Sequence, residues 1–363
     1  DGIRESVASR GRGDVYKRQS LFPFRKRPLS MTVRVGINGF GRIGRNFFRA
    51  AQEQGGDIEI VAVNDLGNQA TMAHLLKYDS VLGNLPNDIS AVEGGITIDG
   101  QLLEVLSERN PADLPWGDFE VDVVIESTGI FTDRDKAAQH LDAGAPLVIV
   151  SAPANGADAT FVVGVNHEEF DKATHKVISN ASCTTNCFVP MVQVLDDAFG
   201  VEKGLMTTVH AYTGDQSLVD GPHSDLRRAR ASAVNIIPTS TGAARATGLV
   251  LQAMNGKLDG TSLRVPIPDG SITDFTAVLS ASPSVEDINA AFASAASKAP
   301  LQDVLSYSED PLVSADIVGD PSSCVFDAGL TMAMDNLVKV SGWYDNEWGY
   351  SNRLVDLVRI TCN

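Results

Sequence analysis

The chain has 363 residues, of which 43% are hydrophobic and 21% are charged, a composition typical of globular proteins and a length that fits two domains. Its formal net charge of −17 disfavours nucleic acid or an anionic membrane as the primary partner, because like charges repel. No apolar run is long enough to span a membrane, and four cysteines are too few for a disulfide-stapled scaffold, so we expect a cytoplasmic protein.

The first thirty residues form a basic segment without apolar periodicity. They carry eight Lys or Arg and three Asp or Glu residues, so removing their net +5 from the formal −17 leaves −22 for the rest of the chain. Such a segment is consistent with an organelle transit peptide, a basic binding arm, or translated upstream or vector sequence before a true start at Met31. Because transit peptides avoid acids, we favour the last interpretation and expect residues 1–30 to be a non-native or disordered tail.

A β-α-β unit opens the body of the chain. The alternating residues Thr32–Ile37 predict a strand, the periodic segment Arg42–Gln54 predicts a helix, and Asp57–Asp65 predicts a second strand. Three further elements continue the alternation: a strand over Val121–Glu126, a short helix over Arg134–Ala143 and a strand over Pro146–Val150. This order predicts an α/β fold with a Rossmann-type, doubly wound parallel sheet.

The turn between the first strand and the helix carries a dinucleotide-binding pattern. It reads Gly39-Phe40-Gly41-Arg42-Ile43-Gly44, in which the glycines let the backbone approach a pyrophosphate at the N-terminus of the helix. Asp65 ends the second strand, where its carboxylate can accept hydrogen bonds from a ribose and repel a 2′-phosphate. A turn without a ligand is the alternative, but motif and context agree, so the sequence predicts an NAD site.

The pattern changes after Cys183. Mostly β segments follow: Gly204–Tyr212, Thr261–Pro266, Ser271–Ser280, Ser322–Leu330 and Leu337–Tyr344. With a helix over Val285–Ala299, they predict an α+β catalytic domain with a mostly antiparallel sheet. A last helix over Asn346–Ile360 is expected to return to the first domain. We therefore expect an NAD-binding domain at 31–181, completed by 346–363, and a catalytic domain at 182–345.

A candidate nucleophile lies in the segment Ser182-Cys183-Thr184-Thr185-Asn186-Cys187. Cys183 follows the strand Lys176–Ser179 and begins a helix, and a helix N-terminus or a neighbouring imidazolium lowers the pKa of a thiol. His210, at the end of a strand, is the available partner. An inert buried cysteine with an unrelated histidine is the alternative. We assign inert burial to Cys187, which would face the core one turn along the helix.

The remaining histidines are assigned no chemistry. We expect all five on the surface or in loops: His74, His140, His167, His175 and His223. No histidine or second cysteine pair lies at metal-ligand spacing, so the sequence predicts no metal site.

From about Thr32 to Ile360 the chain resembles the NAD-dependent, phosphorylating glyceraldehyde-3-phosphate dehydrogenase family in its bacterial form. Eight motifs in chain order carry the resemblance: Gly36–Arg45, Val63–Asp65, Ser127–Gly129, Ser182–Cys187, Val209–Thr213, Ser240–Ala244, Leu263–Pro266 and Trp343–Tyr350. The resemblance implies oxidation of D-glyceraldehyde 3-phosphate to 1,3-bisphosphoglycerate with NAD+ and inorganic phosphate, through a cysteine thioester, in glycolysis or gluconeogenesis.

The resemblance also implies a role for each site residue. Cys183 would be the nucleophile, and His210 would hold it as the thiolate, stabilise the oxyanion and move the proton. Besides the glycine-rich turn and Asp65, the cofactor would contact a second set of residues: Ser127, Thr128, Gly129, Ser151, Asn346 at the nicotinamide carboxamide, and Tyr350. Two phosphate groups would be bound by a third set: Thr213, Asp215 and Arg264 for the substrate, and Ser182, Thr184, Thr241 and Gly242 for inorganic phosphate, with Arg264 near both.

The family further implies a homotetramer, because in that family the loop after Thr213 lies against a neighbouring subunit's cofactor pocket. We interpret three basic residues of this loop, Arg227, Arg228 and Arg230, as an interface or salt-bridge group and not as a second phosphate clamp. Pro222 in the loop and Leu66 after Asp65 fit the NAD-preferring pattern of the family.

Three alternatives stay open. Erythrose-4-phosphate dehydrogenase has a similar architecture but hydrolyses its thioester, and the Ser240–Gly242 stretch favours a phosphate acceptor instead. Aspartate-semialdehyde dehydrogenase is disfavoured by the Trp343–Tyr350 motif. A non-catalytic protein that binds RNA or a partner through this scaffold is disfavoured by the Cys183 and His210 pair and by the acidic body.

Overall fold

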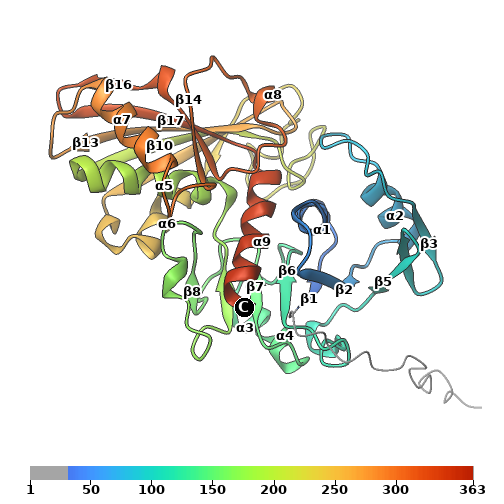
Figure 1. The fold of residues 1–363 in the computed structure, drawn as a ribbon. Helices are drawn as coiled ribbons and strands as arrows, with labels where there is room; N and C mark the ends of the chain where they lie inside the picture. The colour runs from blue at the N-terminus through green and yellow to red at the C-terminus, as the bar shows by residue number, and fades with distance from the viewer. Residues whose placement is uncertain (1–31, 363) are drawn as a thin grey trace, which may run out of the picture. The chain divides into compact units, whose positions relative to one another are not determined.

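The first sheet of the computed structural model, which describes residues 32–362, has nine strands in the order β3-β4-β5-β2-β1-β6-β7-β9-β8 (Figure 1). Their bounds are β1 Val33–Asn38, β2 Ile58–Asn64, β3 Ile89–Val92, β4 Gly95–Ile98, β5 Gln101–Leu106, β6 Val123–Glu126, β7 Val148–Val150, β8 Ala159–Thr160 and β9 Val177–Ser179. The expectation for residues 1–30 lies outside the described residues.

The centre of this sheet places the glycine-rich turn at a switch in strand order. Strand β1 pairs in parallel with β2 on one side and with β6 on the other. Because the chain crosses to opposite sides of β1, the carboxyl ends of β1 and β6 border a crevice, where ligands bind in sheets of this type. The predicted doubly wound parallel sheet is confirmed, with β3 and β4 added as antiparallel edge strands.

Helices of the first half of the chain follow the predictions in part. The bounds are α1 Arg42–Gln54, α2 Gln69–Lys77, α3 Arg134–Ala137 and α4 Gln139–Asp142, with 3-10 turns η1 Pro111–Asp113 and η2 His167–Glu169. Helix α1 has the predicted bounds, because its apolar periodicity and its Gly55 stop are local signals. The single helix expected over Arg134–Ala143 is two short helices that meet at Ala138.

The second sheet has the order β11-β12-β10-β13-β17-β15-β14, with β16 paired to β17. Its bounds are β10 Val201–Ala211, β11 Ile237–Ser240, β12 Leu258–Val265, β13 Ser271–Leu279, β14 Leu305–Ser308, β15 Cys324–Asp327, β16 Met332–Met334 and β17 Leu337–Tyr344. The sheet is mostly antiparallel, as predicted, but β10 pairs with β12 and β14 with β15 in parallel. The parallel pair β10–β12 brings two strand ends side by side at the candidate site.

Five helices and two 3-10 turns accompany this sheet among the described residues. Their bounds are α5 Cys183–Phe199, α6 Ala243–Val250, α7 Val285–Ala296, α8 Ser314–Ile317, α9 Trp348–Cys362, η3 Gln252–Met254 and η4 Ala328–Leu330. The sequence did not predict α6, because its eight residues include Thr247 and Gly248, which are weak helix formers. Helix α5 packs on the sheet, where the rings of Phe188 and Phe275 meet edge to face at 4.8 Å.

Helix α9 connects the two halves of the described chain. It runs beside α1 (Figure 1), and its buried residues Leu354, Val355 and Leu357 belong to the same apolar core as Phe47 of α1. The segment just before α9 therefore lies close to the N-terminal end of α1, where the candidate cofactor turn begins.

Candidate active site

Cys183 is the first residue of α5 and lies directly after a strained turn. Strand β9 ends at Ser179, Ala181 adopts a left-handed backbone conformation with φ of 54°, and Ser182 caps the helix by accepting the amide proton of Thr185 at 3.0 Å. A left-handed conformation at a residue other than glycine is typical of functional turns. The predicted placement of the thiol, at a strand end and a helix start, is what the structure has.

His210 at the end of β10 and Cys183 at the start of α5 meet at one end of the second sheet. The Cys183 Sγ lies 3.5 Å from Nε2 of His210, and Nδ1 of the same ring lies 2.7 Å from the Ala211 carbonyl oxygen. Because a carbonyl only accepts, we assign the ring proton to Nδ1, which leaves the lone pair of Nε2 facing the thiol. The thiol can therefore donate its proton to the imidazole.

The charge state of this pair differs from the expectation. Burial is the main cause that raises the pKa of the Cys183 thiol, although the Arg264 guanidinium opposes it. Burial, followed by the positive charge of Arg264, lowers the pKa of His210 to about 3. Burial thus favours the neutral form of both groups, whereas the resemblance implies a thiolate held by an imidazolium.

Arg264 lies beside His210 because β10 and β12 run in parallel, with the two residues in register. One of its terminal nitrogens donates to the Ala211 carbonyl at 3.1 Å and to Oγ1 of Thr213 at 3.0 Å. Its buried Nε has no hydrogen-bond partner among residues 32–362. An unpaired buried donor on a cation is a natural site for an anion. Because the chain as a whole is acidic and repels anions, an anionic substrate needs a local basic site of this kind.

The predicted phosphate-binding residues fall into two groups. Thr213 donates to Asp215, and Asp215 is held at 2.7 Å by Arg228, so this group lies next to Arg264. Thr241 and Gly242 stand at the start of α6, which packs on α5, and the hydroxyl of Thr241 accepts the amide proton of Ala243 at 3.2 Å. No hydrogen bond in the described part of the chain joins this second group to Cys183 or Arg264.

Thr184, a predicted phosphate ligand, is buried, and its hydroxyl group already has a partner within the protein. Its Oγ1 lies 2.8 Å from the hydroxyl of Tyr344, which also lies 2.8 Å from Oγ1 of Thr208. The ring of Tyr344 packs edge to face against His210 with centroids 5.9 Å apart. Thr184 therefore ties the start of α5 to the second sheet and fixes both members of the thiol–imidazole pair.

The glycine-rich turn has the geometry of a phosphate cradle. Gly39 has φ of 93°, and a Cβ there would lie 2.6 Å from the backbone nitrogen of Thr128. By contrast, a Cβ on Gly41 would meet nothing within 4 Å, so its lack of a side chain leaves open space. No side chain caps the N-terminus of α1. An uncapped helix start facing open space fits a dinucleotide pyrophosphate.

Asp65 holds this turn against the end of β2. Its two carboxylate oxygens accept the backbone N–H groups of Phe40 at 2.9 Å and Gly67 at 2.8 Å. Ser127 donates to the carbonyl of Gly39 at 2.7 Å, so its hydroxyl supports the turn. The structure thus brings Asp65 and Ser127 to the predicted crevice, with part of their bonding capacity already used.

His140 corrects a sequence expectation. It was expected on the surface or in a loop, but its side chain is fully buried, with Nε2 3.0 Å from Glu126 and Nδ1 accepting from Nε1 of Trp116 at 2.9 Å. Glu126 in turn accepts the backbone N–H of Thr128 at 2.8 Å. Because burial depends on tertiary packing, local sequence did not reveal it. This network holds up the Ser127–Gly129 segment, which faces the glycine-rich turn.

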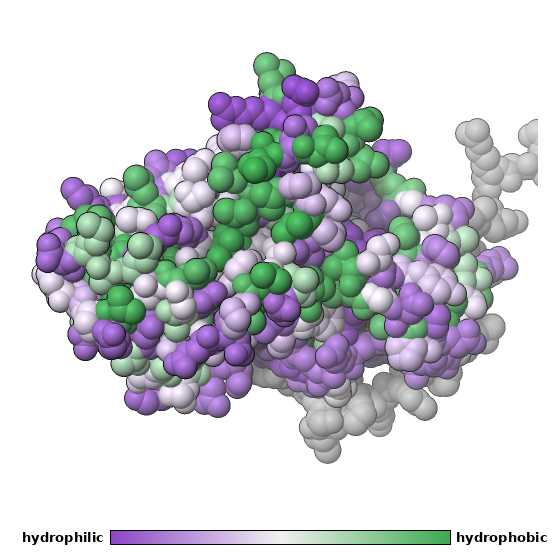
Figure 2. All heavy atoms as spheres, turned by 90° about the horizontal axis from the view of Figure 1, so that it is seen from above, coloured by the Kyte–Doolittle hydropathy of each residue, from purple (hydrophilic) through white to green (hydrophobic). Residues whose placement is uncertain are grey.

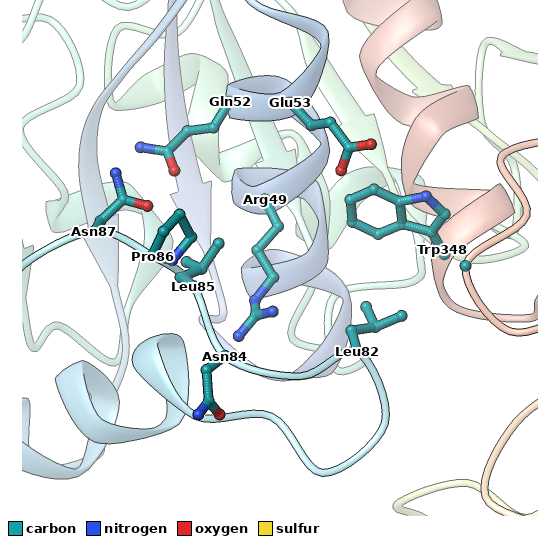
Figure 3. Close-up of a pocket in the computed structure, with 10 residues that line it drawn as sticks. Arg49, Gln52, Glu53, Leu82, Asn84, Leu85, Pro86, Asn87 and Trp348 are labelled. Atoms are coloured by element: carbon teal, nitrogen blue, oxygen red, sulfur yellow. The ribbon is translucent and has the colours of Figure 1, made fainter.

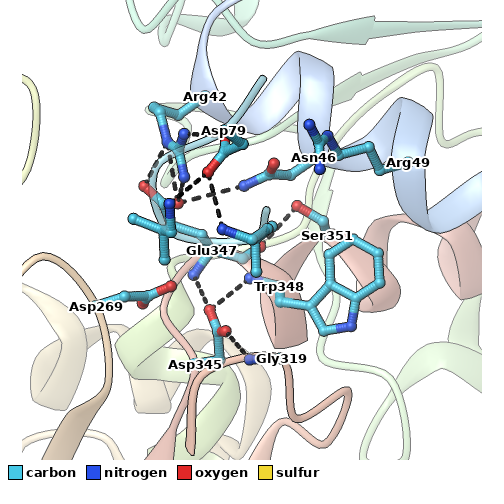
Figure 4. A network of polar contacts seen from close by, with 12 residues as sticks. Arg42, Asn46, Arg49, Asp79, Asp269, Gly319, Asp345, Glu347, Trp348 and Ser351 are labelled. Atoms are coloured by element: carbon cyan, nitrogen blue, oxygen red, sulfur yellow. Dashed lines mark hydrogen bonds and ion pairs between the residues drawn. The ribbon is translucent and has the colours of Figure 1, made fainter. Parts of the chain in front are cut away.

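Arg42 and Ile43 are the first two residues of α1, so their backbone N–H groups lie in its uncapped first turn. The side chain of Arg42 points elsewhere: it forms ion pairs with Glu347 and with Asp79 (Figure 4). Asn46 adds a hydrogen bond to Glu347 at 3.3 Å. These contacts fasten the segment before α9 to α1.

Asn346 lies in the segment before α9, and Tyr350 lies in the first turn of α9. Ser271 accepts the Ala211 N–H at 3.1 Å, so its own proton is directed to Oδ1 of Asn346 at 2.6 Å. No hydrogen bond within residues 32–362 uses the amide nitrogen of Asn346, so it is left as a donor. Tyr350 donates to the Ala181 carbonyl at 3.0 Å, two residues before Cys183. Ser151 follows β7 and donates its N–H to the Glu126 carbonyl at 2.9 Å.

A separate pocket of about 650 Å³ lies away from this site (Figure 3). It is lined by Arg49, Gln52 and Glu53 of α1, by the loop from Leu82 to Asn87, and by Trp348. None of the predicted site residues lines it, so it takes no part in the chemistry considered for Cys183.

Two family models and a set of curated relatives match the chain. Residues 33–134 match the glyceraldehyde 3-phosphate dehydrogenase NAD binding domain, and residues 182–346 match the C-terminal domain of the same enzyme. Glyceraldehyde-3-phosphate dehydrogenase 2 of Streptomyces avermitilis is 62% identical over 328 residues, 90% of this chain and 98% of that relative. The glyceraldehyde-3-phosphate dehydrogenase of Mycolicibacterium smegmatis is 62% identical over 338 residues, covering 91% and 98%. The chain belongs to the glyceraldehyde-3-phosphate dehydrogenase family.

Membership of the glyceraldehyde-3-phosphate dehydrogenase family confirms the predicted α/β fold class, the predicted enzyme class and NAD as the cofactor. The cradle around Gly41 and the uncapped start of α1 are compatible with that cofactor. No helix within residues 32–362 combines the length and the apolar character needed to cross a membrane. The described residues hold no cluster of three or more His, Cys, Asp or Glu suited to a metal ion.

The position of Asp65 predicts a change in cofactor choice. Replacing Asp65 by Gly is expected to raise the ratio of NADP to NAD use by about tenfold, because a carboxylate that repels a 2′-phosphate is removed. The measurement is kcat/KM with each cofactor. Asp118→Asn, which removes an exposed carboxylate elsewhere, is the control. An unchanged ratio in the Gly variant would show that Asp65 does not contact the ribose.

Two further residues of the candidate site were missed by sequence reasoning. Tyr344 bridges Thr184 and Thr208, and Ser271 orients Asn346. Tyr344 falls inside the Trp343–Tyr350 motif, which was a usable signal. Ser271 follows a Gly at the start of a strand and carried no signal of its own.

Proposed function

We propose that the chain converts D-glyceraldehyde 3-phosphate, NAD+ and inorganic phosphate to 1,3-bisphosphoglycerate and NADH through a thioester on Cys183. The observation that carries this proposal is the 3.5 Å approach of the Cys183 Sγ to the unprotonated Nε2 of His210, beside Arg264. Family membership supports the substrate, and the intact thiol–imidazole pair supports catalysis over a purely binding role.

His210 supplies the proton chemistry in this proposal. As the Cys183 sulfur attacks the aldehyde carbon, Nε2 of His210 takes the thiol proton, so the strongly nucleophilic thiolate forms only when it is used. The resulting imidazolium stabilises the oxyanion and returns a proton to it. His210 then removes that hydroxyl proton as the carbon is oxidised to the thioester. When bound, NAD+ accepts the hydride that leaves this carbon.

Arg264 binds the anionic part of the substrate together with Thr213 and Asp215. A planar guanidinium with an unpaired Nε suits a phosphate, which accepts a forked pair of hydrogen bonds. Ser182, Thr184, Thr241 and Gly242 are proposed for the inorganic phosphate that attacks the thioester and releases the Cys183 thiolate. Since Thr184 is bonded to Tyr344, we assign the direct contacts first to the more open Thr241 and Gly242.

The cofactor would be held by the backbone of Gly39 to Gly44, by Asp65 at the ribose, and by the free amide nitrogen of Asn346 at the nicotinamide carboxamide. Tyr350 would pack beside the nicotinamide ring. Four further residues would line the cofactor along the crevice: Ser127, Thr128, Gly129 and Ser151.

We also propose the domain division 31–181 with 346–363, and 182–345, since the two sheets fall on either side of Ser182. A homotetramer is proposed because large apolar residues of the loop after β10, among them Leu218, Leu226 and Val234, are more than 70% exposed. A cytoplasmic location is proposed from the family resemblance and the small number of cysteines. Figure 2 shows hydrophobic residues gathered in a band on the face seen from above. Within this loop Arg228 pairs with Asp215 and Arg230 with Asp220.

A phosphate requirement tests the proposed reaction. NADH formation from glyceraldehyde 3-phosphate is expected to need inorganic phosphate after the first turnover, and to proceed with NAD+ in preference to NADP+. Absorbance at 340 nm, with and without phosphate and with each cofactor in parallel, gives the result. Sustained turnover without phosphate would favour thioester hydrolysis, as in erythrose-4-phosphate dehydrogenase.

A further inference from the structure

Three acids, two of them buried, lie around Asn346. Asp345 and Glu347 are its neighbours in sequence, and Asp269 lies two residues before Ser271, which donates to the Asn346 amide oxygen. The side chains of Asp269 and Asp345 are 2% and 1% exposed. In Figure 4 the carboxyl group of Asp269 points toward the segment that carries Asp345 and Glu347.

Two of the three acids have the partners that ionised carboxylates need. Asp345 accepts three backbone N–H groups, from Gly319 at 2.7 Å, Glu347 at 2.8 Å and Trp348 at 2.6 Å. Glu347 accepts Nε of Arg42 at 2.9 Å and forms an ion pair with the same guanidinium. Both carboxylates therefore have donors to their oxygens.

Asp269 lacks such partners. Its Oδ1 accepts the Gly270 N–H at 2.9 Å, and its Oδ2 is buried with no donor to it anywhere in residues 32–362. Burial, followed by the negative charges of Asp345 and Glu347, raises the pKa of Asp269 to about 9. A protonated Oδ2 needs an acceptor, and Figure 4 shows the Asp269 carboxyl group directed toward the segment that carries the Asp345 carboxylate.

We propose that Asp269 is a positioning residue that works as a protonated acid: its Oδ2–H donates to the Asp345 carboxylate and so ties the turn carrying Ser271 to the segment carrying Asn346. Both ends of the Ser271–Asn346 hydrogen bond are then fixed, and the free amide nitrogen of Asn346 is held ready for the carboxamide of the cofactor. This inference rests on the proposed role of Asn346. The site is distinct from the thiol–imidazole pair and adds a requirement for a proton that chemistry at Cys183 does not use.

The charged surroundings of Asp269 define what its ionisation would do. Arg42 of α1 faces Glu347 and Asp79 and is neutralised by them. Around α8, Asp316 accepts the Val313 N–H and Asp320 accepts the Ser322 N–H, so both turn back on their own backbone. Cys183 of α5 also lies within electrostatic range of Asp269. No ion pair within residues 32–362 involves Asp269, so an ionised Asp269 would repel Asp345 and loosen the segment around Asn346.

NAD binding against pH tests the positioning role. Dissociation constants from calorimetry are compared for the unmodified chain, Asp269→Asn, Asp269→Ala and the control Asp118→Asn. Asparagine keeps a donor for Asp345 but cannot ionise.

At pH 7 we expect Asp269→Asn to bind NAD within about twofold of the unmodified chain and Asp269→Ala to bind at least about fivefold more weakly. From pH 8 to pH 10 the unmodified chain and the control should lose about tenfold in affinity while Asp269→Asn stays constant. A parallel loss in all four proteins, or unchanged binding by Asp269→Ala at pH 7, would overturn the proposal.

Urea unfolding of the cofactor-free protein tests the protonation itself. The folded-state pKa of Asp269 lies above its unfolded value of 3.8, so the native state binds the extra proton between about pH 4 and pH 9. Over this window the stability of the unmodified chain should fall with rising pH relative to Asp269→Asn. A constant difference between the two midpoints would mean that Asp269 is ionised in the folded protein. A chain that binds no NAD at any pH would instead contradict the proposed function, while the unfolding data would still decide the state of Asp269.

Discussion

Replacing Cys183 by Ser is expected to reduce NADH formation by at least about 10³-fold while NAD binding stays almost unchanged. The sulfur that approaches Nε2 of His210 at 3.5 Å is the proposed point of attack on the aldehyde. A serine hydroxyl is far harder to ionise, and the neutral imidazole of His210 is a weak base in this buried setting. Cofactor binding is expected to survive, because the glycine-rich turn and Asp65 do not contact Cys183.

The second cysteine of the same helix is a matched control. Cys187 is fully buried and donates to the Gly342 carbonyl at 3.5 Å, so Cys187→Ser should lower stability by about 1 kcal/mol and leave turnover largely intact. This placement agrees with its predicted core position. Steady-state rates, NAD binding by fluorescence quenching and thermal unfolding separate the two variants. Full turnover by Cys183→Ser would remove the covalent scheme.

How far the sequence predicts this fold depends on how local each signal is. Helix α1 and strand β17 were predicted with the bounds that the structure has, because apolar periodicity and a glycine stop, or alternation before a turn, lie within each segment. The break between α3 and α4 at Ala138 and the short helix α6 depend on tertiary contacts that no local pattern encodes. The antiparallel strands β3 and β4 were missed for the same reason.

In the candidate site, too, features with a local sequence signal were predicted and features that depend on tertiary packing were not. The strand end before Cys183 and the strand end at His210 could be placed from sequence, and the parallel pairing of β10 with β12 then brings Arg264 beside them. Charge states could not be placed, because they depend on burial. His140 and Asp269 are both polar residues that the fold buries, and the sequence around them does not predict their burial. The same desolvation raises the pKa of the Cys183 thiol.

Replacing His210 by Asn is expected to slow turnover by about 10²-fold or more, because the base that takes the thiol proton is lost. Alkylation of Cys183 by iodoacetate gives an independent measure of thiolate formation. Without Nε2 as acceptor, alkylation at neutral pH should become slower and its pH profile should move to higher pH. His74→Asn, an exposed position on α2, is the control. An alkylation profile that matches the unmodified chain would contradict the pairing of Cys183 with His210.

The same variant carries a stability prediction with a defined sign. Burial lowers the folded-state pKa of His210 to about 3, below its ordinary value of 6.5, so the unfolded chain binds an extra proton between these two values. The unmodified chain should therefore lose up to about 1.4 kcal/mol of unfolding free energy per pH unit as the pH falls through this window. In His210→Asn this contribution should be absent, so its acid-induced loss of stability should be smaller. Urea unfolding midpoints at pH 7, 5 and 4 measure the difference. Parallel curves would mean that the folded-state pKa of His210 equals its ordinary value, so burial would not be what keeps the imidazole neutral.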